Sequence, residues 1–224
     1  NGREINSFEG HTSEPKSIDW SPDGTLLRTS DWADPTVRTW VVSNLNEADS
    51  RTELGGSRSQ DSDTDSGPQL LDTFFAGHGQ MTCVTWSPDG DKLASCDDQS
   101  GGFWQWDIPG DQHIGCQLHH MGAAYSVAWS PDGSKFALGG ATGAICWDIE
   151  AGWEGIYLGG YDGTVGQITW SPDSTKIAGA CDGPADEDGN DGESSIKVWD
   201  SVTGDELLIN LKKLRMACPC AYCK

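Results

Sequence analysis

One five-residue sequence, Trp-Ser-Pro-Asp-Gly, restricts the fold of this chain more than any other feature. It occupies residues 20–24, 86–90 and 129–133, and a fourth copy at 170–174 ends in Ser instead of Gly. Pro fixes φ near the value that a type I turn requires, and Asp and Gly suit the positions that follow. Strand-like residues precede and follow each copy, so each predicts the corner of a β-hairpin. Four such corners predict an all-β repeat protein.

Each corner lies inside a longer unit of four expected strands. In the second unit the strands are expected at residues 70–75, 81–86, 92–96 and 102–107, with Gly-His after the first and Trp-Asp closing the last. The same order recurs along the chain. It places the units at about residues 3–41, 70–107, 114–148 and 156–200, followed by an extra strand at 206–211.

A period of about 40–45 residues with four strands, Gly-His and Trp-Asp resembles the WD40 repeat, whose units form the blades of a β-propeller. The resemblance covers residues 3–211 and implies a WD40-type propeller with four recognisable four-stranded blades. In that family a His, a Ser or Thr, an Asp and a Trp link the strands by hydrogen bonds. The matching positions, expected to be structural, are His11, Ser30, Asp34 and Trp40 in unit 1, His78 and Trp106 in unit 2, His120 and Trp147 in unit 3, and Trp199 in unit 4.

Four blades are fewer than the seven or eight that usually close a WD40 ring, which leaves three alternatives. The chain is part of a larger propeller, a reading that the absence of an initiator Met favours; or two copies close an eight-bladed ring as a homodimer; or four blades close alone or form an open arc. An unclosed half would expose apolar blade faces and strand edges.

Composition limits the classes of partner. Fourteen basic and 35 acidic side chains give a net charge of −21, which disfavours nucleic acid and anionic membranes and favours proteins with basic surfaces. No apolar run reaches the roughly 20 residues of a membrane helix. Five of the eight cysteines lie singly in strand-like runs, as is typical of a reducing compartment, so an intracellular, cytoplasmic protein is expected.

No catalytic motif is present in the sequence. The chain lacks a phosphate-binding Gly-Lys-Ser or Gly-Lys-Thr run, a Gly-x-Ser-x-Gly elbow and a His-Glu-x-x-His zinc motif. We therefore expect a protein that is not an enzyme and needs no cofactor.

Three segments depart from the repeat. Residues 43–69 form a polar, acidic insertion in which Asp61, Asp63 and Asp65 have the alternation of a calcium loop, although Ser66 replaces the expected Gly. A second acidic insertion, residues 182–193, carries Asp186, Asp188 and Asp191 and is a candidate partner-binding patch. The tail, residues 212–224, contains Cys218, Cys220 and Cys223, three thiols that lack the fourth ligand of a zinc site. No metal is expected at either candidate.

The function that best fits these features is a non-catalytic scaffold that mediates protein–protein interactions. Three Trp residues outside the repeat's own positions are candidates for exposed anchors, with packing between blades as the alternative: Trp32, Trp104 and Trp153. Two alternatives remain. Ile-Asp-Trp-Ser at 18–21 with Thr-Trp-Val-Val at 39–42 is weakly similar to echinoderm microtubule-associated-protein-like proteins, which implies a cytoskeletal role. WD40 arrays also form the sensor region of larger signalling ATPases or kinases.

Overall fold

The structure is a computed structural model. It describes residues 7–42, 69–75, 79–99, 101, 103–108, 122–149, 151–152, 154–159, 163–183 and 194–207, and the backbone of 112–116. All regular secondary structure in these segments is β-strand, so they contain no helix with the length and apolarity needed to cross a membrane. The predicted all-β fold built from propeller blades is confirmed.

The strands form four antiparallel sheets, which are the blades of the propeller. Blade 1 contains β1 (Pro15–Trp20), β2 (Leu26–Asp31), β3 (Thr36–Val41) and β4 (Gln69–Phe75). Blade 2 contains β5 (Met81–Trp86), β6 (Lys92–Asp97), β7 (Phe103–Asp107) and β8 (Gln112–Cys116). Blade 3 contains β9 (Ala124–Trp129), β10 (Lys135–Gly140), β11 (Gly143–Asp148) and β12 (Glu154–Tyr157). Blade 4 contains β13 (Thr164–Trp170), β14 (Lys176–Asp182) and β15 (Ser195–Asp200).

The blade boundaries differ from the predicted units by one strand. The strand expected to open unit 2 is β4, and it pairs with β3 of blade 1, with Val37 opposite Phe74. β8 and β12 likewise pair with the strands before them, β7 and β11. The predicted boundaries 3–41, 70–107, 114–148 and 156–200 are therefore corrected, because backbone pairing assigns each opening strand to the preceding sheet.

The chain begins a fourth strand of blade 4 after β15. Glu206 forms an antiparallel bridge with Trp199, and the Leu207 N–H donates to the Val198 carbonyl at 2.7 Å. These two residues belong to the extra strand expected at 206–211, and the rest of that strand lies outside the described residues.

The Trp-Ser-Pro-Asp-Gly corners share one hydrogen-bond scheme. In the first corner the Gly24 N–H donates to the Ser21 carbonyl at 2.9 Å, and the Ser21 hydroxyl donates to Asp23 Oδ1 at 2.6 Å. Gly24 has φ of 71°, in the left-handed region that glycine tolerates. In the fourth corner Ser174 adopts φ of 58° and is the one non-glycine residue with positive φ among those described. The sequence therefore dictates a tight turn at every corner.

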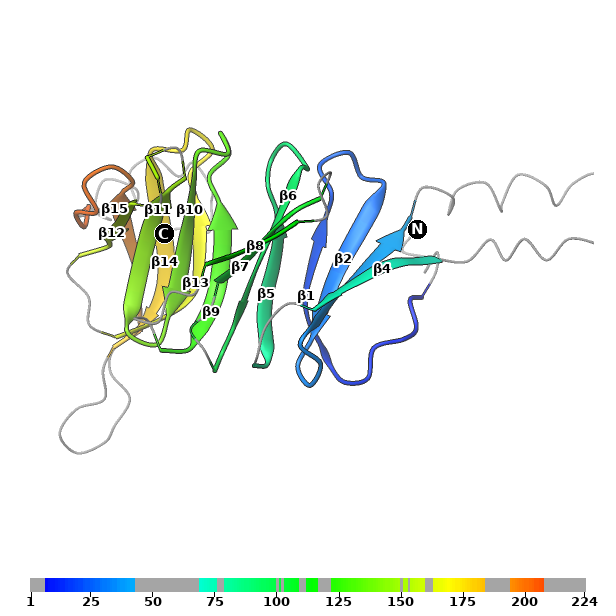
Figure 1. Ribbon diagram of the computed structural model, residues 1–224. Helices are drawn as coiled ribbons and strands as arrows, with labels where there is room; N and C mark the ends of the chain where they lie inside the picture. The colour runs from blue at the N-terminus through cyan, green and yellow to red at the C-terminus, as the bar shows by residue number, and fades with distance from the viewer. Residues whose placement is uncertain are drawn as a thin grey trace, which may run out of the picture.

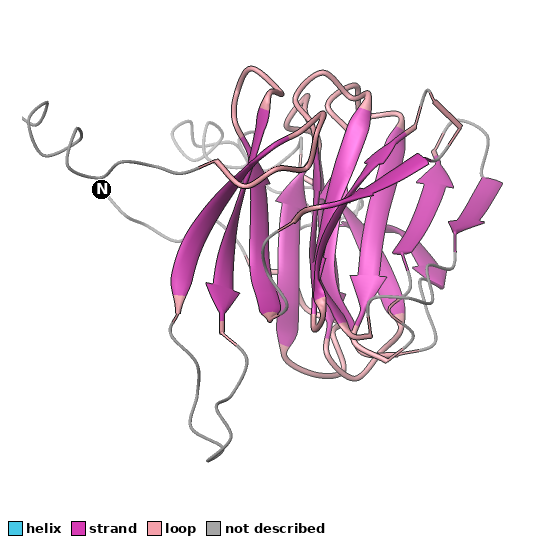
Figure 2. Cartoon of the chain, turned by 90° about the vertical axis from the view of Figure 1, so that its left-hand side faces the viewer, coloured by secondary structure: helices cyan, strands magenta, loops and turns pink. Residues whose placement is uncertain are grey.

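Consecutive blades stack side by side through their first strands, β1, β5, β9 and β13 (Figures 1 and 2). Each interface joins two unlike surfaces. One blade contributes small residues from its second strand, and the next contributes bulky ones: Ala94 and Cys96 of blade 2 pack with Trp129 and Phe136 of blade 3, beside Phe103 of blade 2, which stacks on Phe136. We call these the small face and the large face of a blade.

The same pairing of faces recurs at the next interface. Ala137 and Cys146 on the small face of blade 3 pack with Ile177 and Trp199 on the large face of blade 4. Blade 1 departs from this rule at Arg28, which stands where blades 2 and 3 have Ala94 and Ala137. Its guanidinium lies between the rings of Phe74 and Trp86, at 4.6 and 4.5 Å. Burial lowers the pKa of Arg28 to about 10.

Candidate functional site

The side-chain network of blade 1 centres on Thr29 of β2. The Trp40 indole Nε1–H donates to Thr29 Oγ1 at 2.8 Å, and His11 Nε2 lies 2.5 Å from the same oxygen. Phe8 packs edge-on against Trp40, with 5.5 Å between ring centroids. The network therefore ties β2 and β3 to the segment that precedes β1.

The hydroxyl in this network was expected to be that of Ser30, and that expectation is corrected. Ser30 is fully buried, but its hydroxyl makes no hydrogen bond. Successive residues of a strand face opposite sides of the sheet, and every second residue shares a side. Leu27 pairs with Trp40, so Thr29, two residues later, shares the face of Trp40 and Ser30 does not. Counting outward from Leu27 would have identified Thr29.

An arginine absent from the expected network extends it. Arg38 Nη1 donates to His11 Nδ1 at 2.7 Å and lies 3.3 Å from Asp31 Oδ2, while Nη2 donates to Asp34 Oδ2 at 2.8 Å. A guanidinium only donates, so Nδ1 of His11 is the unprotonated nitrogen and Nε2–H donates to Thr29. Asp34 therefore joins the network through Arg38.

The carboxylate nearest to His11 is that of Asp31, which is fully buried. Burial raises the pKa of Asp31, but the Asp34 N–H, the Thr12 N–H and Arg38 together lower it below the ordinary value. Asp31 also accepts the Ala33 N–H at 3.0 Å. This ionised side chain fixes the loop between β2 and β3.

Among the described residues, no other blade has a hydrogen-bonded hydroxyl at the position of Thr29. The position of Thr29, defined by its pairing with Arg38, is held by Ser95 in blade 2, Leu138 in blade 3 and Gly179 in blade 4. Trp199 donates instead to the Gly159 carbonyl at 2.9 Å, and the buried Trp147 Nε1 has no hydrogen-bond partner. Trp106 is buried beside Phe74 of blade 1. His78 and His120 lie outside the described residues.

The three Trp residues that are candidates for exposed anchors differ in their exposure to solvent. Trp32 is 38% exposed, and Lys16 Nζ lies 5.1 Å from the centroid of its ring. Trp104 is 7% exposed, so the expectation that it is an exposed anchor is corrected. It occupies the position of Arg38 in blade 2, and its Nε1 donates to Asp97 Oδ2 at 3.3 Å. Trp153 lies outside the described residues.

The remaining candidate sites lie in segments that the structure does not describe. These are the acidic groups Asp61, Asp63, Asp65, Asp186, Asp188 and Asp191, and the thiols Cys218, Cys220 and Cys223. Among the residues that are described, no three His, Cys, Asp or Glu side chains are grouped as metal ligands.

One surface that sequence reasoning missed is the large face of blade 1. Trp20 is 52% exposed, whereas Trp86, at the same position of the next repeat, is 6% exposed. The repeat assigns both residues the same role, so it gives no signal of this difference. The exposure follows from the place of blade 1 at the end of the stack.

The family comparison agrees with this architecture. The model of the WD40 family (WD domain, G-beta repeat) matches residues 2–40 and 69–105, the first two predicted units. No curated protein matches the chain. The two matched segments are therefore WD40 repeats, and all four antiparallel sheets have the same Ser-Pro-Asp corner between their first and second strands.

Proposed function

We propose that the protein is a non-catalytic scaffold that binds a partner protein at the end of blade 1 where Trp32 is exposed. The observation that carries this proposal is a half-buried aromatic side chain on a loop that the buried network holds in place. Asp31 accepts the Ala33 and Asp34 N–H groups, at 3.0 and 2.7 Å, and the Trp32 N–H donates to the Glu14 carbonyl at 3.1 Å. A preorganised aromatic anchor loses little entropy on binding.

The charge of the chain indicates the class of partner. With a net charge of −21, the chain attracts basic surfaces, and such attraction raises association rates and weakens with salt. Next to Trp32, Lys16 pairs with Glu14 at 3.1 Å, so its own charge is partly neutralised. A protein with a basic surface and an apolar pocket for an indole ring fits this end of the blade.

The test is quantitative affinity capture from cells that make the protein, comparing wild type with Trp32→Ala. The proposal expects a set of basic proteins that the wild type binds, that Trp32→Ala loses, and whose capture falls as salt rises. Tyr157→Ala is the control, because Tyr157 is another exposed aromatic residue, on the outer strand of blade 3. If Trp32→Ala captures the same proteins as wild type, the proposal is wrong.

A further inference from the structure

In the described part of the chain no blade covers the large face of blade 1, and its margin is exposed and apolar, although Phe8 and His11 bury its centre at Trp40 and Thr29. Ile18, Trp20, Leu70 and Phe75 are all exposed, and cross-strand pairing places them on one face. Ile18 pairs with Thr29, Trp20 reaches Leu70 through Leu27 and Trp40, and Phe75 pairs with Thr36. Partners opposite each other in a sheet share a face. In blades 2, 3 and 4 the equivalent large face packs against the preceding blade. In blade 1 the exposed part of this face has no such neighbour.

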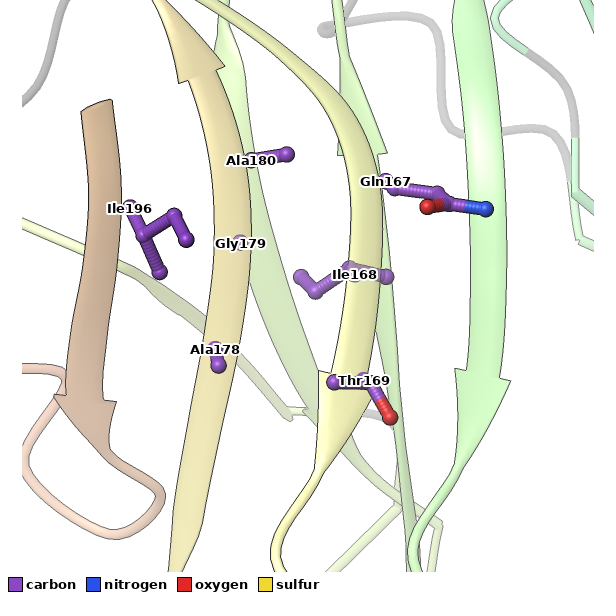
Figure 3. A pocket seen from close by; sticks show the side chains of 7 residues that line it. All are labelled: Gln167, Ile168, Thr169, Ala178, Gly179, Ala180 and Ile196. Carbon is purple, nitrogen blue, oxygen red and sulfur yellow. The ribbon is translucent and has the colours of Figure 1, made fainter. Parts of the chain in front are cut away.

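The small face of blade 4, at the other end of the stack, is also covered by no other blade in the part of the chain that the structure describes. Gln167, Thr169, Ala178 and Ala180 line a hollow of about 430 Å³ together with Ile196, which is 79% exposed (Figure 3). Gln167 pairs with Ala180 and Thr169 with Ala178, so these four side chains share the face turned away from blade 3. The hollow exists because this face carries two alanines and no bulky neighbour.

The interfaces between blades within the chain show which side chain of the next blade covers the position of this hollow. At the position of Ala178, Arg28 contacts the Trp86 ring at 4.5 Å, and Ala94 packs in one cluster with Trp129. In each case the corner Trp of the following blade covers this position. On blade 1 that corner Trp is Trp20, which has no blade to cover.

A second repeated contact fixes the position of one blade relative to the next along the direction of their first strands. Ser17 accepts the Val84 N–H at 3.0 Å, and Ser126 accepts the Ile168 N–H at 3.3 Å. Each donor lies two residues before its corner Trp, and each acceptor three residues before. The equivalent positions on the uncovered faces are Ile18 on blade 1 and Gln167 on blade 4. Gln167 carries an amide oxygen, which can accept such an N–H.

We infer that the small face of blade 4 binds the large face of blade 1 of a second copy of this chain. The contact continues the series of interfaces already present between blades. It is heterologous, and two such contacts related by a two-fold axis close a ring of eight blades, within the four to eight typical of propellers. Blades 1 and 4 of one copy lie at opposite ends of the stack, so they do not cover each other (Figure 1).

The charge of the chain opposes this association at long range. The residues at the centre of the contact are uncharged: Ile18, Trp20, Leu70 and Phe75 on one side, and Gln167, Thr169, Ala178, Ala180 and Ile196 on the other. Exposed charges of opposite sign, Lys176 and Asp182, lie at the two ends of β14 on the same face as Ala178 and Ala180. Each copy has a net charge of −21, so the two copies repel each other at longer range, and salt screens this repulsion. Dimer formation therefore strengthens as salt rises, the reverse of binding to a basic partner.

Sedimentation equilibrium of the purified chain tests the inference. Wild type is expected at twice the 24.0 kDa of one chain, with more dimer at 0.5 M than at 0.05 M salt. Ala178→Trp fills the hollow and Trp20→Lys puts a charge on the large face, so each variant is expected to be at least 10-fold weaker in self-association. Val202→Trp and Val202→Lys are matched controls at an exposed position outside both faces.

Mixing the two variants distinguishes the arrangement of the copies. The Trp20→Lys chain keeps its small face and the Ala178→Trp chain keeps its large face, so together they form one intact contact and associate 1:1. A wild type that is monomeric at all concentrations overturns the inference, as do variants that dimerise like wild type or a mixture that stays monomeric. Circular dichroism spectra of both variants identify a loss of fold. A monomer that still captures partners through Trp32 overturns this inference alone and leaves the proposed function standing.

Discussion

Thr29 Oγ1 lies 2.8 Å from Trp40 Nε1, whereas the hydroxyl of its buried neighbour Ser30 has no hydrogen-bond partner. The two residues are adjacent in β2 but lie on opposite faces of blade 1. Thr29 joins the network with His11 and Trp40, and Ser30 points toward blade 2, opposite Ser17 and Val37. The stabilising role of a hydroxyl in this strand therefore depends on its face.

Replacing Thr29 with Val is expected to lower the free energy of unfolding by about 2 kcal/mol, because it leaves the Trp40 indole N–H buried without an acceptor. Thr29→Ser keeps the hydroxyl and is expected to retain most of the stability. Ser30→Ala is expected to change the stability by less than about 0.5 kcal/mol. Urea unfolding followed by Trp fluorescence measures all three, and equal losses for Thr29→Val and Ser30→Ala would contradict the network as described.

The sequence predicts the strands of this protein well and their pairing less well. The corners at Ser-Pro-Asp are local, since Pro, Asp and Gly each satisfy one position of the turn. The pairing of β4 with β3 links strands separated by a long insertion, and no residue in β4 specifies it. The predicted units are therefore offset by one strand from the blades.

Trp104 shows a second limit of sequence reasoning. It was interpreted as an exposed anchor because it lies outside the positions that the repeat reserves for Trp. Trp104 and Trp106 are two residues apart on β7, so they share a face, and that face packs against blade 1. Strand alternation would have placed Trp104 in the interface. To predict that Trp20 is exposed, one must know that blade 1 lies at the end of the stack. Local sequence patterns do not contain this information.

The backbone of Ser174 is expected to be strained by its positive φ, and replacing Ser174 with glycine is expected to remove this strain. A non-glycine residue in the left-handed region costs roughly 1–2 kcal/mol, and glycine returns part of this through its flexibility when unfolded. Ser174→Gly, at φ of 58°, should therefore raise the free energy of unfolding by about 0.5–1 kcal/mol. Thermal and urea denaturation measure the change.

The reverse substitution in another corner is the control for Ser174. Gly133 has φ of 76°, and a Cβ there would lie 3.9 Å from its nearest neighbour, Pro88, so no collision complicates the result. Gly133→Ser should lower stability by about 1 kcal/mol. A stabilising Gly133→Ser would show that side-chain contacts outweigh backbone conformation in these corners.

Cys83 is expected to be more reactive than the other described thiols. It pairs across the sheet with Cys96, whose hydrogen bond lowers the pKa of the Cys83 thiol below its ordinary value. Burial raises the pKa of Cys96 well above its ordinary value and that of Cys146 to about 11. Since the thiolate is the nucleophile, alkylation of Cys83 by iodoacetamide should reach half its maximal rate at a lower pH than alkylation of Cys146.

Peptide mass spectrometry assigns the alkylation to each cysteine. In Cys96→Ala the midpoint for Cys83 should move to higher pH, because the hydrogen bond that stabilises the thiolate is gone. Cys146 serves as the unreactive reference at pH 8. A midpoint for Cys83 that does not change in Cys96→Ala would show that another neighbour lowers its pKa.

The corner aspartates are expected to stabilise the fold above about pH 4. The Ser130 hydroxyl and the Ser134 N–H hold the pKa of Asp132 below its ordinary value of 3.8, and burial only partly opposes them. Because the folded pKa lies below the unfolded one, this stabilisation is complete above 3.8 and is lost as pH falls through the folded value. Asp132→Asn removes the titrating group. The stability difference between wild type and Asp132→Asn should therefore shrink between pH 4 and pH 2 in urea titrations, and a constant difference would exclude linkage to this carboxylate.

The offset of one strand between repeat and blade also determines how the chain would respond to being cut. Residues 43–68 connect β3 to β4, yet the two strands are paired directly along six positions. A single peptide-bond cleavage in this connection would sever the covalent link within blade 1 and leave its sheet joined. The N-terminal piece would carry β1, β2 and β3, and the C-terminal piece would supply β4. The two polypeptides would then be held together non-covalently by the pairing of β3 with β4 in blade 1, and the stack of blades would remain assembled after cleavage.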